Sequence, residues 1–201
     1  MRRPPCRLLL LVCAVVLLTA ASASAQSDWT LLTRLFMTGV SDGSEPAGYK
    51  VYSAFGLEVG VRRDLGRSFG LELDLGPQSR EVELLDGTDP VPNLGSLEVL
   101  PLVLLARWTP DLHGAVRPYL GVGGAFTVFW EKSGALNSTE IPTELGAVVQ
   151  LGADIALSPR LCANLDLRSQ SLTADIADSG VPLATLRIHP TTLAVGLGYR
   201  F

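Results

Sequence analysis

The chain has 201 residues, of which 47% are hydrophobic, and a formal net charge of −4 at pH 7. The length suits one domain. The negative net charge argues against binding of nucleic acid, because a nucleic-acid-binding protein needs a broad basic surface. The sequence has three cysteines and two histidines, in no spacing that would hold a metal, so no cofactor or metal site is expected.

The first 25 residues have the three parts of a secretory signal peptide. Three arginines lie within Met1–Arg7, an apolar run follows at Leu8–Leu18, and "ASASA" supplies the small residues of a cleavage site. We therefore expect residues 1–25 to be removed and residues 26–201 to form the mature domain. No later stretch has the roughly 20 apolar residues that a membrane-spanning helix needs.

The remainder is organised as segments in which large apolar residues fall on every second position. In "FGLELDLG", for example, Phe69, Leu71 and Leu73 alternate with small or acidic residues. A period of two indicates strands. The eight predicted strands are Trp29–Val40, Phe55–Arg62, Phe69–Gly76, Leu97–Trp108, Arg117–Trp130, Leu145–Leu157, Leu161–Arg168 and Leu186–Phe201.

The connections between these strands alternate between long and short, as in an up-and-down barrel with short periplasmic turns and longer outer loops. A soluble β-sandwich or a lipocalin-like barrel is the alternative. The repeated aliphatic face and the Gly- and Ala-rich opposite face favour a closed barrel in lipid. We predict an all-β, eight-stranded antiparallel up-and-down transmembrane β-barrel in the outer membrane of a Gram-negative-type bacterium. The long connections are expected at Ser41–Lys50, Leu85–Ser96, Glu131–Pro142 and Thr173–Ala184.

With the aliphatic face on lipid, the other face carries charges of both signs into the lumen. Buried charges must be paired or hydrated. They form either a structural network that fills a narrow barrel or a polar path for a solute, and eight strands leave little open space. The predicted lumen network consists of Arg34, Glu58, Arg62, Glu72, Asp74, Arg107, Gln150, Asp154, Asp166 and Arg168.

Part of the inner face is apolar, on two neighbouring strands. These residues either line a pocket for a hydrophobic molecule or simply pack together. Pro101 also predicts a local break in the strand ladder. The predicted apolar wall consists of Val99, Pro101, Val103, Leu105, Tyr119 and Phe129.

Three segments carry a family resemblance. "LEVLPLVLLARW", "RPYLGVGGAFTVFW" and the closing "LRIHPTTLAVGLGYRF" resemble the matching strands of the OmpW family of small outer-membrane proteins. The resemblance implies an eight-stranded barrel with a hydrophobic lumen that helps small hydrophobic molecules reach or cross the outer membrane. Gly196, Tyr199 and Phe201 are similar to the insertion signal that such barrels present to the barrel assembly machinery.

Three functions follow from these features. The first is a passive binder or conduit for small hydrophobic molecules, and the second is a structural or surface-interaction barrel with a lumen closed by its charges. The third is a lipid A-modifying hydrolase, which would need a nucleophile, a base and an orienting acid within reach. The candidates are His189 with Thr191 and Ser179 nearby. This set lacks a recognisable arrangement of nucleophile, base and acid, so no enzyme is predicted.

Overall fold

The computed structural model describes residues 28–41, 49–51, 53–86, 89–112, 114–132, 143–178 and 181–201. The predicted signal peptide lies outside these ranges. All regular elements in the described ranges are strands, and no helix there is long and apolar enough to cross a membrane. The strands are β1 (Trp29–Ser41), β2 (Tyr49–Val51), β3 (Ala54–Asp64), β4 (Phe69–Leu75), β5 (Gln78–Asp86), β6 (Asp89–Trp108), β7 (Val116–Lys132), β8 (Glu144–Ala156), β9 (Leu161–Asp178) and β10 (Val181–Arg200).

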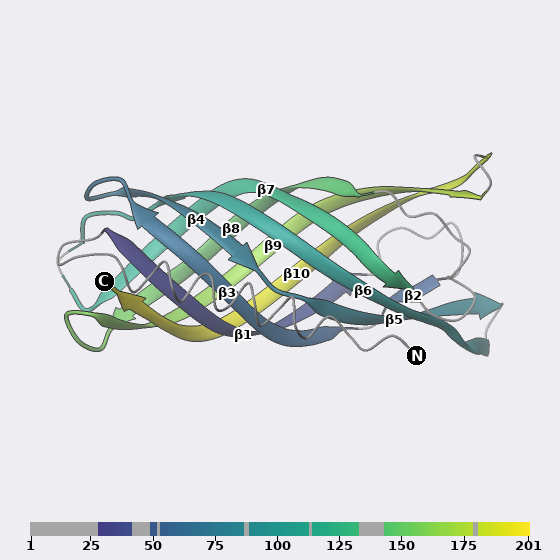
Figure 1. The fold of residues 1–201 in the computed structure, drawn as a ribbon, viewed down its shortest axis with the longest axis horizontal. Coiled ribbons are helices and arrows are strands. Elements are labelled where there is room, and N and C mark those ends of the chain that lie inside the picture. The colour runs from purple at the N-terminus through teal and green to yellow at the C-terminus, as the bar shows by residue number, and fades with distance from the viewer. Residues whose placement is uncertain are drawn as a thin grey trace.

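These strands close into a barrel (Figure 1). The neighbour order is β2-β5-β6-β4-β3-β1-β10-β9-β8-β7, and an additional β6–β7 pairing joins the two sides. Because β2 extends β3 and β5 extends β4, the wall has eight antiparallel members. The predicted eight-stranded antiparallel barrel is therefore confirmed.

Alternation along each strand separates a lipid face from a lumen face. On β4, Phe69, Leu71 and Leu73 are exposed, whereas the intervening Glu72 and Asp74 are completely buried. An apolar outer band with a polar interior is the arrangement that a barrel in lipid requires. Trp29, Trp108 and Tyr199 are about half exposed near the strand ends, where interfacial aromatic residues belong.

Two of the predicted long loops are instead strand. β5 and β6 run to Asp86 and from Asp89, and β9 and β10 run to Asp178 and from Val181. These segments lie between the stretches of regular alternation, and the β9–β10 hairpin has a register shift between Pro182 and Ala184. A bulge of this kind accommodates proline without ending the strand pairing. The predicted loop at Ser41–Lys50 is described only at its two ends, and that at Glu131–Pro142 only as far as Lys132.

The break in the strand ladder that was predicted at Pro101 lies not in β6 but between its neighbours β4 and β5. β6 pairs with β7 through Pro101↔Thr127 without a shift there, and its irregularity lies between Glu98 and Val99. On the other side, β6 pairs with β4 as far as Leu102 and with β5 from Val99. Leu100 and Pro101 thus lie opposite the break between β4 and β5. Proline fits this position because it can donate no hydrogen bond.

Candidate functional site

The lumen is crossed by an ion-pair belt with Arg34 as its hub. From β1, the Arg34 guanidinium donates to Glu58 at 2.9 Å, to Asp74 at 3.0 Å and to Glu72 at 2.6 Å. Its Nε donates to Asn164 Oδ1 on β9 at 2.6 Å. An arginine presents five donors in a fixed planar fork, so this one side chain satisfies partners on three other strands.

Arg168 makes the second set of contacts, reaching from β9 to the opposite wall. Its guanidinium donates to Glu58, and at 3.2 Å to Asp74. Its Nε donates to Asp166 at 2.6 Å on its own strand. Glu58 and Asp74 are therefore shared between the two arginines, which couples β9 to β3 and β4.

Arg62 and Arg107 continue the belt toward the end of the barrel that carries the short turns. Asp154 on β8 accepts from Arg107 and, at 2.8 Å, from Arg62. Arg107 also contacts Glu72 at 3.2 Å. A carboxylate held by two arginines compensates part of the cost of removing these charges from water.

Neutral polar side chains complete the belt, and Tyr119 is among them. Tyr119 lies on the inner face as expected, but it does not act as part of an apolar wall. The guanidinium of Arg107 stacks 3.4 Å from its ring centroid, and its hydroxyl donates to Asp166 at 2.7 Å. An aromatic ring with a polar tip can serve a charged neighbourhood in this way. Gln150 donates to Glu72 and Asp166.

Asn164 was not among the predicted site residues, although it bridges three parts of the belt. It accepts from Arg34 and donates to Asp154 at 2.7 Å and to Tyr119 at 3.0 Å. The alternation of β9 had placed it on the inner face, but its uncharged side chain gave no further signal. The ten predicted network residues are all buried, and together with Tyr119 and Asn164 they define the ion-pair belt.

An apolar cluster adjoins the belt on the side away from the short turns. Val103, Leu105, Ala125 and Val148 form one buried group on β6, β7 and β8. On β6 and β8 the cluster begins two residues beyond Arg107 and Gln150. In register, Leu105 lies opposite Glu72 and Val103 opposite Asp74, so the cluster also lies beside the carboxylates of β4. Val99 and Pro101 extend the buried inner face of β6. The side chain of Phe129 lies outside the described part of the structure.

The C-terminal residues are held in the wall. The rings of Tyr199 and Phe201 meet edge to face with centroids 5.2 Å apart, and Phe201 N donates to Trp29 O at 3.1 Å. A Cβ at Gly196 would overlap Thr33 O on β1. The segment therefore needs glycine where β10 pairs closely with β1, and its aromatic residues lie at the barrel rim.

The histidines form no recognisable catalytic group in the described residues. His189 and Thr191 are exposed on one outward-facing edge of β10. Ser179 and His113 lie outside the described residues. Within the described ranges, no group of three or more His, Cys, Asp or Glu side chains is placed to hold a metal ion.

Comparison with known proteins gives consistent results at the level of sequence and of fold. The OmpW family model matches residues 51–201. Outer membrane protein W of Salmonella typhimurium is 27% identical over 177 residues, covering 79% of this chain and 82% of that protein. The dibenzothiophene metabolism operon protein PahQ of Pseudomonas aeruginosa is 26% identical over 119 residues, covering 57% of this chain and 56% of that one. The solid-state NMR structure of outer membrane protein AlkL in DMPC bilayers superposes with a TM-score of 0.70 at 21% identity, covering 90% and 94% of the two chains.

Proposed function

Because the chain belongs to the OmpW family and is an outer-membrane β-barrel, we propose that it is a passive binder or conduit for small hydrophobic molecules. The observation that carries this proposal is the apolar cluster of Val103, Leu105, Ala125 and Val148 on the lumen face, next to the charges of the belt. A concave apolar wall next to a few fixed polar groups is the usual form of a small-molecule site.

The position of the belt supports one direction of access. On the strands that carry the apolar cluster, the belt residues Arg107, Gln150 and Asp154 lie between it and the end with the short turns. The belt also ties opposite walls together through buried ion pairs. A hydrophobic molecule would have to separate these pairs to pass along the axis, at high cost in a medium of low dielectric constant. We therefore infer that the solute enters the apolar cluster from the outer side of the membrane.

The name of PahQ refers to an operon for the metabolism of dibenzothiophene, which is a flat aromatic molecule without charge. A solute of this class has no group that could satisfy the belt, whereas it could pack on aliphatic side chains. We propose uncharged hydrocarbons and small aromatic heterocycles as the substrate class.

Replacing Val103 with aspartate is expected to reduce uptake of such a solute to the level of cells that lack the protein. The new carboxylate would lie opposite Asp74, and an unpaired charge in an apolar site costs enough to weaken binding by more than about tenfold. Uptake is measured from the fluorescence of dibenzothiophene in cells with an intact outer membrane. Heat-modifiable migration on gels shows that the barrel has folded.

Two further variants make this result specific. Val103→Thr keeps the shape without a charge and is expected to retain most of the uptake, whereas the uncharged polar variant Leu105→Asn gives an intermediate value. If all three folded variants take up the solute at the rate of the unmodified protein, the apolar cluster is not the site.

The completeness of the belt favours a second candidate function, a structural or surface-interaction barrel with a closed lumen. All five belt carboxylates contact at least one arginine. This reading expects equal uptake by cells with and without the protein and no conductance in planar bilayers. Uptake that depends on Val103 would exclude it.

We propose that the exposed His189 and Thr191 do not form a hydrolase site, since both face outward and no hydrogen bond joins them in the described part of the chain. Mass spectra of lipid A from cells with and without the protein should then be identical. A shortened or deacylated lipid A that appears only with the protein would restore the enzymatic reading.

We also propose that the C-terminal segment is read by the barrel assembly machinery. Deleting Phe201 is expected to lower the amount of folded protein in the outer membrane by more than about tenfold. Phe201 contributes one backbone hydrogen bond and one ring contact to the finished barrel, worth only about 1–2 kcal/mol. Refolding into detergent micelles should therefore remain near normal, and an equal loss in both assays would assign Phe201 a purely structural role.

A further inference from the structure

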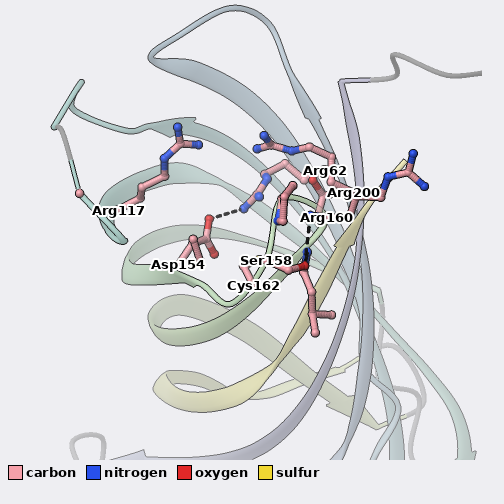
Figure 2. Close-up of a pocket in the computed structure, with 12 residues that line it drawn as sticks. Arg62, Arg117, Asp154, Ser158, Arg160, Cys162 and Arg200 are labelled. Carbon is pink, nitrogen blue, oxygen red and sulfur yellow. Dashed lines mark hydrogen bonds and ion pairs between the residues drawn. The ribbon is translucent and has the colours of Figure 1, made fainter.

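A separate hollow opens at the end of the barrel that carries the short turns. It has a volume of about 230 Å³, and its lining comes from β1, β3, β7, β8, β9 and β10 and from the turn at residues 157–160. Figure 2 shows Arg117 on one side of this hollow and Arg200 on the other, with Asp154 and Cys162 between them. Since short turns face the periplasm in barrels of this kind, the hollow is the periplasmic mouth.

The charge of this mouth is predominantly positive. Four arginines line it, Arg62, Arg117, Arg160 and Arg200, against the single carboxylate of Asp154. Asp154 is already engaged by Arg62 and by Arg107 from the belt. Asp154 therefore balances Arg62 on the floor of the mouth and Arg107 deeper in the lumen, and in the described part of the chain it forms no ion pair with Arg117 or Arg160.

The arginines at the rim differ in how far they are engaged. Arg200 contacts Asp64 at 3.1 Å, whereas Arg117 and Arg160 make no ion pair within the described residues. Both are exposed and lie at the edge of the hollow. They are free to turn toward an anion that enters from the periplasm.

Two buried polar atoms in the lining point to the same ligand chemistry. Thr30 Oγ1 and Arg62 Nε have no hydrogen-bond partner, although these residues are only 1% and 3% exposed. Arg62 Nε comes within 3.5 Å of Asp64 Oδ1 without forming a hydrogen bond. Buried donors are seldom left unpaired, so these two atoms can both donate to an acceptor from outside the chain, either water or an anion.

We propose that the periplasmic mouth binds a small oxyanion, a carboxylate or a phosphate, between the floor formed by Arg62 and Thr30 and the rim formed by Arg117 and Arg160. Arginine forks match the paired oxygens of both groups. The apolar side chains of Pro159 and Leu161 also line the hollow, which suits an anion with a short apolar body. This site is independent of the proposed hydrophobic solute site, from which the belt separates it.

The direct test measures binding to the assembled barrel in zwitterionic detergent. Benzoate, inorganic phosphate and uncharged benzyl alcohol are titrated separately and followed by calorimetry. We expect benzoate or phosphate to bind and benzyl alcohol not to bind. Tighter binding of benzoate would identify a carboxylate ligand, and tighter binding of phosphate would identify a phosphate ligand. Absence of binding by both anions at millimolar concentration overturns the proposal.

Variants locate the site. Arg117→Gln with Arg160→Gln is expected to weaken anion binding at least about tenfold, because hydrogen bonds to charged groups are lost. The matched control is Arg67→Gln, which removes an exposed arginine at the same end of the barrel but outside the hollow. Equal weakening by the control would show a nonspecific charge effect and would overturn the proposal.

Thr30→Val tests the floor without removing a charge. Since Thr30 Oγ1 has no partner in the protein, its loss should leave the urea midpoint unchanged while anion binding weakens several-fold. Unchanged anion binding in this variant would show that Thr30 does not contact the anion, and would contradict the proposed floor of Arg62 and Thr30.

Cys162 provides an independent reporter, because its half-buried thiol lies in the lining. Methanethiosulfonate reagents transfer their thioalkyl group to the cysteine sulfur and release methanesulfinate. With each rate divided by that of the same reagent with a free thiol in solution, we expect the anionic sulfonatoethyl reagent to be favoured over the cationic trimethylammonioethyl reagent, and benzoate or phosphate to slow both. The double variant should reduce the preference for the anionic reagent, whereas Arg67→Gln should not. A preference for the cationic reagent would contradict an anion-binding mouth.

Discussion

Replacing Arg34 with methionine is expected to lower the free energy of unfolding by about 3–5 kcal/mol, the cost of breaking a buried ion pair from one side. The guanidinium serves Glu58, Glu72 and Asp74 at once. Methionine fills much of the same volume but leaves three carboxylates to share the remaining arginines. Urea unfolding of the barrel in lipid vesicles, followed by tryptophan fluorescence, measures the change.

The control for this experiment is Arg63→Met, one strand away. Arg63 is exposed and contacts the Trp29 ring at 5.4 Å, an interaction worth about 0.5–1 kcal/mol at an exposed site. If Arg34→Met costs no more than Arg63→Met, the belt contributes little to stability. Its charges would then be well hydrated in the folded barrel.

A second large effect is expected at Gly152, where Gly152→Val should destabilise the barrel by about 1–3 kcal/mol through overpacking. A Cβ there would overlap the Tyr119 ring and the backbone oxygen of Leu165. To make room, Tyr119 must leave the position from which it donates to Asp166. The urea midpoint and the yield of heat-modifiable protein both report the loss.

Gly124→Val is the matched control for this substitution. Gly124 lies on the neighbouring β7, and a Cβ there would meet nothing closer than Gly146 O at 3.6 Å. Valine also favours strands over glycine by up to about 1 kcal/mol, so this variant should be as stable as the unmodified barrel or more so. If the two valine variants are equally destabilised, the cause is the replacement of glycine itself and not overlap with Tyr119 and Leu165.

The period-two pattern predicted the barrel and the inner face of each strand well, because alternate side chains must point to opposite sides of a sheet. It also identified the ten charged or amide residues now found buried together. Pattern alone does not determine which residues meet, since this depends on strand register. Arg34 and Asn164 are 130 positions apart, and nothing in the local sequence of either residue indicates the other.

Other parts of the structure gave weaker signals in the sequence. Tyr119 was assigned by its ring to the apolar wall, whereas its hydroxyl and the nearby Arg107 bring it into the belt. The arginine-lined mouth was not predicted, because Arg117 lies in the first residues of β7 and Arg160 lies in the turn directly before β9. Pairing of β7, β8 and β9 brings these two residues to the same end of the sheet, and closure of the barrel places Arg62 of β3 in the same hollow.

The pairing of the first strand with the last has a consequence for the order of folding. β1 joins β10 in an unbroken register from Thr30↔Arg200 to Ser41↔His189, so the two partners are separated by nearly the whole chain. Contacts this distant in sequence form slowly, because the entropy of closing the loop is lost before they stabilise the chain. Arg34 lies on β1, and its partner Asn164 lies on β9, beside β10. The central arginine can therefore leave water completely only in the last step of folding, which makes closure of the seam and drying of the lumen one cooperative event.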